Sequence, residues 1–295
     1  MAIVKFAAPV ADLVRQRRSC RRYQERPIGE EGRRALAEVL AANRNGPFGG
    51  QARFALLAAT AEDRAALKGL GTYGFIKGAA GFIVGAIGRG PRDLEDYGWL
   101  MERAILAATD LGLDTCWLGG TFTKSSFAKK IGLAEGELIP AVAAVGYAVE
   151  DGFSRDRIRR MAGANSRLPP DELFFNAAFG VPLSQADAGV YAEALELVRW
   201  APSASNRQPW RIVRTATGWH FYLARTRGYG KGTFIFAVLR IADLQRVDMG
   251  IAMCHFELAA REAGLDGSWV IADPGIAPPP SGAEYIATWR PLGAE

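Results

Sequence analysis

Six arginines fall between Arg15 and Arg26, and Glu25 is the single acidic residue among them. At the centre of this group, four guanidinium groups surround a hydroxyl in the run Arg17-Arg18-Ser19-Cys20-Arg21-Arg22. A doubly charged phosphate is held well by bidentate arginines together with a hydroxyl donor. We therefore predict an anion site here, with a solvated helix face as the alternative explanation of the charges. The candidate anion-binding residues are Arg17, Arg18, Ser19 and Arg21.

A second basic group holds five arginines within residues 155–167, against one aspartate. The chain has 36 Lys and Arg and 31 Asp and Glu, a net charge of +5, so the remainder outside the two groups is acidic. This distribution indicates local anion sites more than a uniformly basic surface. A nucleic-acid surface would also need aromatic side chains between the arginines for base stacking, and only Tyr23 lies among them. We expect no nucleic-acid partner.

A different set of short polar groups lies in the second half of the chain, in the segment Pro202-Ser203-Ala204-Ser205-Asn206-Arg207-Gln208-Pro209-Trp210. Proline, serine and asparagine in this order are typical of a tight turn after a helix. Such a turn presents hydroxyl, amide and backbone groups to a ligand, although it can also be an ordinary connection. The candidate ligand-binding residues are Pro202, Ser203, Ala204, Ser205 and Asn206.

The elements that must position these groups are duplicated along the chain. Residues 96–117 and 248–269 are identical at ten of 22 positions at a constant offset of 152 residues. Both copies place apolar residues at alternating intervals of four and three, which predicts amphipathic helices. Gly112 and Gly264 then supply the C-terminal stop. Both copies also end in the pattern GLDxxW, which unrelated helices rarely share.

Further elements pair around the repeated helix. We predict helices over 30–43 and 188–200, each followed by a proline-containing turn and then a strand, at 53–59 and 211–214. The glycine-flanked apolar runs GAAGFIVGA and GKGTFIFAV correspond as buried strands. Alternating strands and helices in each half indicate an α/β or α+β fold with a central sheet. We divide the chain into a first half, residues 1–168, and a second half, residues 169–295.

The two copies differ in a complementary way. The first half has the arginine-serine run, while the matching region of the second half, residues 174–181, has no basic residue. The second half has the Pro-Ser-Ala-Ser-Asn turn, whereas residues 46–51 of the first half read GPFGGQ, without hydroxyls. If each copy once supplied half of a symmetric site, the chain retains one site, shared by both halves.

The composition bounds the environment of the protein. Hydrophobic residues make up 49% and charged residues 23% of the 295 residues, values of an ordinary globular protein. No uninterrupted apolar stretch reaches the 18 residues of a membrane span, so we expect no membrane association. The three cysteines are far apart, with no zinc-site spacing and only two histidines. These features fit a reducing compartment, and we predict a cytoplasmic protein.

Three motifs together resemble the nitroreductase family of flavoproteins: RRSCR at 17–21, LGLDTCWLGG at 111–120 and PSASNRQPW at 202–210. The resemblance spans about residues 14–289. It implies a nitroreductase-like α+β fold with two mostly antiparallel sheets, in which a homodimer with two FMN sites is fused into one chain. The chain departs from the family in lacking the RRS run in its second half and the PSxxN turn in its first. These losses leave one FMN per chain, and the fusion predicts a monomer.

The resemblance also implies roles for individual residues. The RRS run and the element Ser166-Arg167 would hold the FMN phosphate, and the Pro202–Asn206 turn would line the flavin ring. The segment Leu118-Gly119-Gly120 would approach N5 of the ring, since glycine allows close backbone contact. Lys77 resembles a cation beside N1 and O2, although a solvated loop lysine explains it equally well. Cys20 lies among arginines, yet no histidine is placed as its base, and we expect it to be passive.

The implied activity is that of an FMN-dependent NAD(P)H oxidoreductase, with flavin N5 carrying the chemistry and no catalytic side chain. NAD(P)H would donate hydride, and a small planar acceptor such as a nitroaromatic or quinone would take it, in a ping-pong scheme. Two alternatives remain at this level: a flavin-dependent dehydrogenase of a natural product on the same fold, and a non-catalytic flavin-binding protein.

Overall fold

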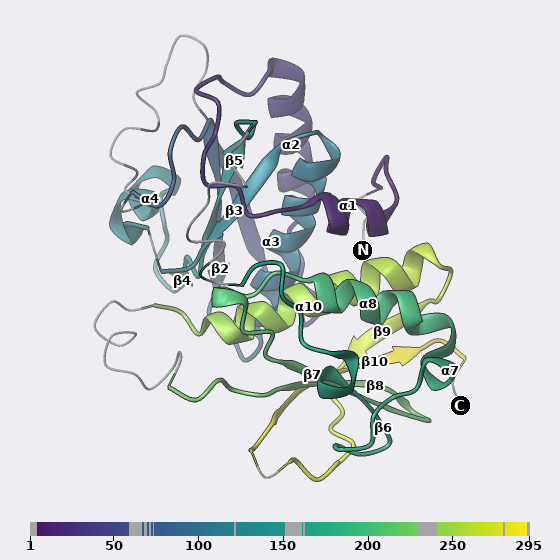
Figure 1. The fold of residues 1–295 in the computed structure, drawn as a ribbon. Coiled ribbons are helices and arrows are strands. Elements are labelled where there is room, and N and C mark those ends of the chain that lie inside the picture. The colour runs from purple at the N-terminus through teal and green to yellow at the C-terminus, as the bar shows by residue number, and fades with distance from the viewer. Residues whose placement is uncertain are drawn as a thin grey trace.

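A computed structural model describes residues 5–58, 67, 70, 72, 74–120, 122–150, 161, 163–228, 241–279 and 281–293. The described chain forms two five-stranded sheets with helices packed between and around them (Figure 1). The first sheet is drawn in the upper part of Figure 1 and the second in the lower part. All strands of the first sheet precede residue 168, and all strands of the second follow residue 169.

The first sheet has the order β1-β2-β5-β3, with the short β4 beside β2, and every pair is antiparallel. Buried apolar residues fill its centre, as expected of strands covered on both faces. Its strands are β1 (Ala52–Ala58), β2 (Gly81–Gly88), β3 (Asp114–Leu118), β4 (Glu137–Leu138) and β5 (Val142–Gly146).

The second sheet has the order β6-β7-β8-β10-β9. The β6–β7 pair is parallel and the other pairs are antiparallel. Its strands are β6 (Phe174–Asn176), β7 (Trp210–Thr215), β8 (Gly218–Leu223), β9 (Gly267–Val270) and β10 (Glu284–Pro291). Two mostly antiparallel sheets flanked by helices confirm the predicted α+β class.

Two long helices, α3 (Asp93–Asp110) and α10 (Leu244–Glu262), form the centre of the molecule and pack against each other. In Figure 1, α10 and α8 (Ala192–Trp200) lie between the two sheets. The other helices among the described residues are α1 (Val10–Gln16), α2 (Glu30–Ala42), α4 (Lys124–Ile131), α6 (Pro170–Leu173) and α7 (Gln185–Ala188), with the 3-10 turns η2 (Gly189–Tyr191) and η3 (Ala204–Asn206). None of the described helices is both long and apolar enough to span a lipid bilayer.

The two central helices cross at a pair of repeat-related glycines. A Cβ atom on Gly98 would overlap the carbonyl oxygen of Val247, and a Cβ atom on Gly250 would overlap that of Glu95. Gly250 lies 152 residues after Gly98, and Val247 lies 152 residues after Glu95, so the contact is reciprocal. The helices therefore meet about a pseudo-twofold axis, as the two subunits of a symmetric dimer do.

The repeat extends to the ends of these helices and to the strands that follow. Gly112 and Gly264 terminate α3 and α10 with φ of 73° and 74°, in the left-handed region that glycine adopts without strain. Strand order then matches β1 with β7, β2 with β8, β5 with β10 and β3 with β9.

This order does not test one strand that was predicted from the sequence. The counterpart of β2 is β8, and the run GKGTFIFAV, at residues 230–238, lies outside the described residues. Apolar runs resemble one another, whereas a position in a sheet is decided by hydrogen bonds between distant residues. A smaller difference concerns the helix expected over 188–200: α8 begins at Ala192, after the turn η2 and the positive φ of Gly189.

Candidate functional site

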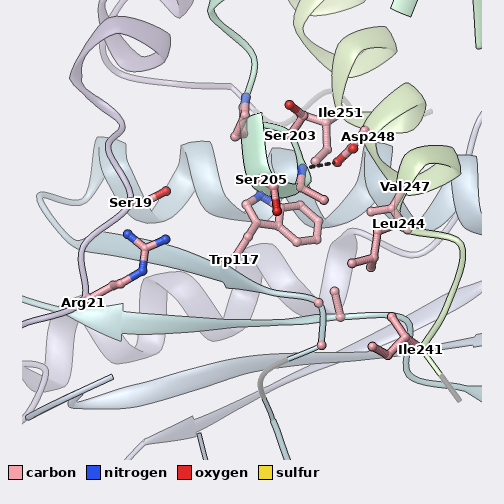
Figure 2. Close-up of a pocket in the computed structure, with 15 residues that line it drawn as sticks. Ser19, Arg21, Trp117, Ser203, Ser205, Ile241, Leu244, Val247, Asp248 and Ile251 are labelled. Atoms are coloured by element: carbon pink, nitrogen blue, oxygen red, sulfur yellow. Dashed lines mark hydrogen bonds between the residues drawn. The ribbon is translucent and has the colours of Figure 1, made fainter. Parts of the chain in front are cut away.

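A pocket of about 400 Å³ lies where the end of β3 meets α10 and the 202–206 turn (Figure 2). Both halves of the chain contribute to its wall. The first half supplies Ser19, Arg21, Trp117, Gly119, Gly120 and Ala141. The second half supplies Pro202, Ser203, Ala204, Ser205, Ile241, Leu244, Val247, Asp248 and Ile251. Eight of the fifteen residues predicted for a ligand site thus line one composite pocket.

The arginine-serine run reaches this pocket as an extended segment. Its backbone bridges β3 in parallel through Ser19 and Thr115, and the Cys20 N–H donates to the Thr115 carbonyl at 2.8 Å. Side chains alternate along extended backbone, so Ser19 and Arg21 face the pocket together (Figure 2). Cys20 points the other way into a buried apolar cluster, and burial raises the pKa of its thiol to about 12. This environment fits the passive role expected of Cys20.

Arg17 and Arg18 line a separate cavity of about 50 Å³. Arg17 is buried, and its Nε lies 3.8 Å from Oε1 of the fully buried Glu102. Its Nε and Nη1 have no hydrogen-bond partner within the described part of the chain. The structure thus places the first two arginines of the run outside the larger pocket, with Arg17 directed toward a buried carboxylate.

The 202–206 turn is held in an unusual backbone conformation. Ser205 and Asn206 have φ of 51° and 53°, and Gln208 has φ of 49°. Residues other than glycine seldom adopt these angles, and such strain often accompanies ligand sites. Two hydrogen bonds fix the turn: the Gln208 N–H donates to Ser203 Oγ at 2.9 Å, and the Ala204 N–H donates to Asp248 Oδ1 at 2.9 Å.

Three predicted residues support this turn from behind and do not line the pocket. Asn206 Nδ2 donates to the carbonyl oxygens of Gly163 and Ser166, at 2.8 and 3.0 Å. Arg167 Nη1 donates to Asn206 Oδ1 at 3.4 Å, and its guanidinium lies 5.3 Å from the centre of the Trp200 ring. Ser166 is exposed. Asn206, Ser166 and Arg167 therefore join the segment between the halves to the turn.

At the end of β3, alternation again separates neighbouring residues. The Trp117 ring faces the pocket, whereas Leu118 is buried in the cluster that contains Cys20. Gly119 and Gly120 follow, and the side chains of Leu244 and Ile241 lie close to them. A Cβ atom on Gly119 would come within 2.6 Å of the end of the Leu244 side chain, which would have to shift to accommodate it.

Trp117 is oriented by a buried polar network. Its indole N–H donates to Glu102 Oε2 at 2.7 Å, and His255 Nε2 lies 3.0 Å from Glu102 Oε1. Burial alone would raise the pKa of Glu102, but the His255 hydrogen bond and the Arg17 charge outweigh it, and the pKa is lowered. The other imidazole nitrogen, Nδ1, lies 2.9 Å from the Leu197 carbonyl oxygen. The network thus links α3, α10 and the pocket wall.

Lys77 lies apart from the pocket. Its side chain is exposed and lines a polar groove of about 490 Å³ with Arg22, Glu25 and Glu150. Its backbone pairs with the arginine-serine run, since the Lys77 N–H donates to the Arg21 carbonyl at 3.0 Å. The structure therefore brings the Lys77 backbone, and not its ammonium group, toward the pocket residues.

A family model described as "Putative TM nitroreductase" matches residues 10–260. The chain belongs to this family. A solved structure from Thermotoga maritima, titled a "putative nitroreductase", is similar in fold, with a TM-score of 0.57 and 18% identity over 92% of this chain and 93% of that one. Another, from Desulfovibrio desulfuricans and in complex with FMN, has a TM-score of 0.39 and 24% identity over 49% of this chain and 89% of that one. No curated protein matches the chain.

Several pocket residues of this nitroreductase-family chain were not predicted from its sequence. Leu244, Val247 and Ile251 look like ordinary core residues of an apolar helix, and their type gives no signal of a ligand. Asp248 is different, because a carboxyl group inside an apolar helix is unusual and its repeat partner Asp96 is also aspartate. That identity was visible in the repeat and could have marked the residue. Within the described residues, no cluster of His, Cys, Asp or Glu is suited to hold a metal ion.

Proposed function

We propose that this pocket binds one FMN and that the protein is an FMN-dependent oxidoreductase. The observation that supports this most directly is the composite wall, in which the RRS-type and PSxxN-type motifs from opposite halves meet across a single pocket. Pockets of 300–1,000 Å³ with mainly apolar walls and few polar groups suit a ligand of this size. Membership of the nitroreductase family supplies the flavin as the expected cofactor.

The residues present suit the two ends of such a cofactor. Ser19 and Arg21 would hold the phosphate, because a guanidinium and a hydroxyl both donate to phosphate oxygens. Trp117 and the aliphatic side chains of Leu244, Val247 and Ile251 would pack on the ring system. Gly119, Gly120 and the 202–205 turn bring backbone groups to the same wall, where N–H donors can meet ring nitrogens and carbonyl oxygens.

Bound FMN would supply hydride transfer at N5, from NAD(P)H to a small planar acceptor such as a nitroaromatic or quinone. The protein would bind and orient both partners in turn and limit the access of water to the ring. Glu102 would act indirectly, by fixing the Trp117 indole through the 2.7 Å hydrogen bond.

The structure of the first half supports the proposal of one site per chain. Its turn at residues 46–50 is packed directly on Asp96, since a Cβ atom at Gly46 or Gly50 would overlap the Asp96 side chain. Both Asp96 oxygens accept backbone hydrogen bonds, from Phe48 at 2.9 Å and from Gly50 at 2.7 Å. The glycines that replaced the polar turn therefore let the backbone close onto the helix.

Redox titration of the purified protein tests the activity. We expect flavin absorbance that is bleached by NADH or NADPH under anaerobic conditions and restored by added menadione or a nitroaromatic. Bleaching without reoxidation by either acceptor would contradict the proposed class of electron acceptor. Flavin absorbance that neither nucleotide bleaches would contradict the proposed NAD(P)H oxidoreductase. It would favour a non-catalytic flavin-binding protein, or a dehydrogenase whose flavin is reduced by another substrate.

We also propose that the protein acts as a monomer, because its two halves already supply both sides of the pocket. We place it in the cytoplasm. The three cysteines are free and buried, which fits a reducing compartment. Light scattering coupled to size exclusion should give a mass near 31.8 kDa, both with and without FMN. A mass near twice that value would contradict the monomer.

A further inference from the structure

Asp96 and Asp248 occupy the same position in the two repeated helices but have different partners. The Asp96 carboxylate accepts two hydrogen bonds, one at each oxygen, from the Phe48 and Gly50 N–H groups. The Asp248 carboxyl accepts one, from the Ala204 N–H at 2.9 Å, at Oδ1. Its Oδ2 is buried and has no hydrogen-bond partner among the residues that the structure describes. A carboxylate oxygen left in this way is strongly unfavourable, because nothing replaces its lost hydration.

The surroundings of Asp248 favour the protonated form. The residue is 3% exposed, and its pocket neighbours on α10 are the aliphatic Leu244, Val247 and Ile251. Burial raises the pKa of Asp248 well above its ordinary value; the Ala204 N–H lowers it, and the negative charge of Asp243 raises it further. Arg21, the cation of the pocket wall, lies at the opposite side of the pocket in Figure 2. No described cation is therefore placed to hold Asp248 as an anion.

A protonated carboxyl group has a donor to offer at the oxygen that lacks a partner. Asp248 lines the pocket beside Ser203 and Ser205, at the edge where α10 meets the turn (Figure 2). Since the described protein atoms leave Oδ2 without a partner, a molecule bound in the pocket that Asp248 lines is a candidate acceptor. Asp96 accepts hydrogen bonds from two backbone donors. Asp248 accepts a hydrogen bond from only one, and the pocket lies beside it.

We propose that Asp248 is kept as a neutral carboxylic acid whose Oδ2–H donates a hydrogen bond to a ring acceptor atom, a carbonyl oxygen or ring nitrogen, of the planar molecule bound in this pocket. The identity of that molecule, FMN or the electron acceptor above it, rests on the proposed function. The neutral state of Asp248 does not, and it can be measured on the protein without any ligand.

Substitution by asparagine distinguishes the two aspartates. In Asp248→Asn, the amide oxygen can still accept from Ala204 and the amide nitrogen provides a neutral donor, so the variant imitates the protonated acid. In Asp96→Asn, the amide nitrogen would face one of two backbone N–H donors. We expect the melting temperature to stay unchanged for Asp248→Asn and to fall by several degrees for Asp96→Asn, at pH 8. An equal loss in both variants would overturn the proposal.

Infrared difference spectroscopy between the wild type and Asp248→Asn detects a protonated Asp248 carboxyl group directly. We expect the C=O stretch of a protonated carboxyl group at pH 7 in the wild type without ligand, shifted to lower frequency by a bound ring. Titration with FMN, and then with menadione, identifies which ring accepts the hydrogen bond. A missing band, or a band that neither molecule moves, would overturn the proposal. Failure of FMN to bind would contradict the proposed function alone, and the menadione titration would then decide the role of Asp248.

Discussion

At the scale of single residues, the alternation of side chains along extended backbone decides which residues of the predicted anion site face the pocket. Ser19 and Arg21 face the pocket because the segment pairs with β3, while Arg17 precedes that pairing and turns toward Glu102. The sequence identifies the residue types and their spacing, but not where the extended segment begins. Asn206 and Arg167 were likewise predicted as ligand contacts, and their hydrogen bonds to each other and to residues 163–166 depend on a contact between distant segments.

Arg21 and its neighbour Arg22 provide a matched pair for the phosphate contact. Arg21 lines the pocket, whereas Arg22 is exposed and faces the separate groove with Lys77. Arg21→Ala should remove a charge-assisted hydrogen bond of about 1.5–3 kcal/mol, which weakens FMN binding by roughly 10- to 150-fold. Arg22→Ala should leave the dissociation constant almost unchanged. Fluorescence titration measures both, and equal effects of the two substitutions would show that Arg21 does not contact the phosphate.

His220 predicts how stability depends on acidity. It is 1% exposed, between the hydroxyls of Thr288 and Thr215 at 2.7 and 2.8 Å, and burial lowers its pKa from 6.5 to about 4, against a small opposing effect of Asp273. Between these pH values the unfolded chain binds more protons than the folded one. The contribution of His220 to the free energy of unfolding is therefore complete above pH 6.5 and is lost as the pH falls toward 4.

Urea unfolding across this range measures that contribution. The free energy of unfolding should fall by roughly 1–3 kcal/mol more in the wild type than in His220→Gln, which does not titrate there. Comparing the two proteins removes the effect of carboxylates that titrate in both. Identical slopes would mean that His220 becomes protonated in the folded protein without penalty.

At the scale of elements, the sequence predicts what is repeated locally and fails where pairing is long-range. The shared helix pattern and the glycine stops place α3 and α10 within a few residues of their observed bounds. The predicted strand GKGTFIFAV lies outside the described residues, and an apolar run alone does not specify its neighbours in a sheet. The close contact of the helices could have been anticipated from Gly98 and Gly250, which are identical and lie in the middle of apolar helices.

Gly250→Ala tests this helix contact. The added methyl group would overlap the Glu95 carbonyl oxygen of the facing helix, and rigid backbone cannot yield without moving the helices apart. We expect a loss of about 1–3 kcal/mol in the free energy of unfolding, measured in urea. Gly32→Ala is the matched control, since its Cβ atom would lie 3.6 Å from Ile28 in ordinary contact. There the better helix propensity of alanine should stabilise α2 by about 0.5–1 kcal/mol. Destabilisation of similar size at both positions would contradict the tight crossing.

At the scale of the whole molecule, the two halves are complementary parts of one site. The first half contributes the arginine-serine segment and the glycines after β3, and the second contributes the strained turn and α10. Neither half has the complete wall, and α3 and α10 hold the halves in register at their glycine crossing. The sequence predicted this arrangement because each repeat had lost the motif that the other had retained. The repeated aspartate could have marked Asp248 as unusual, but its place in the wall depends on how the turn meets α10.

The flavin content of the purified and FMN-saturated protein tests the central claim most directly. Absorbance of the released flavin, divided by the protein concentration from amino-acid analysis, should give one FMN per chain of 295 residues. That ratio is expected because the pocket draws its motifs from opposite halves, while the corresponding turn of the first half is closed onto Asp96. A ratio near two would contradict the single composite site, and a protein that cannot be loaded with FMN would contradict the flavin assignment itself.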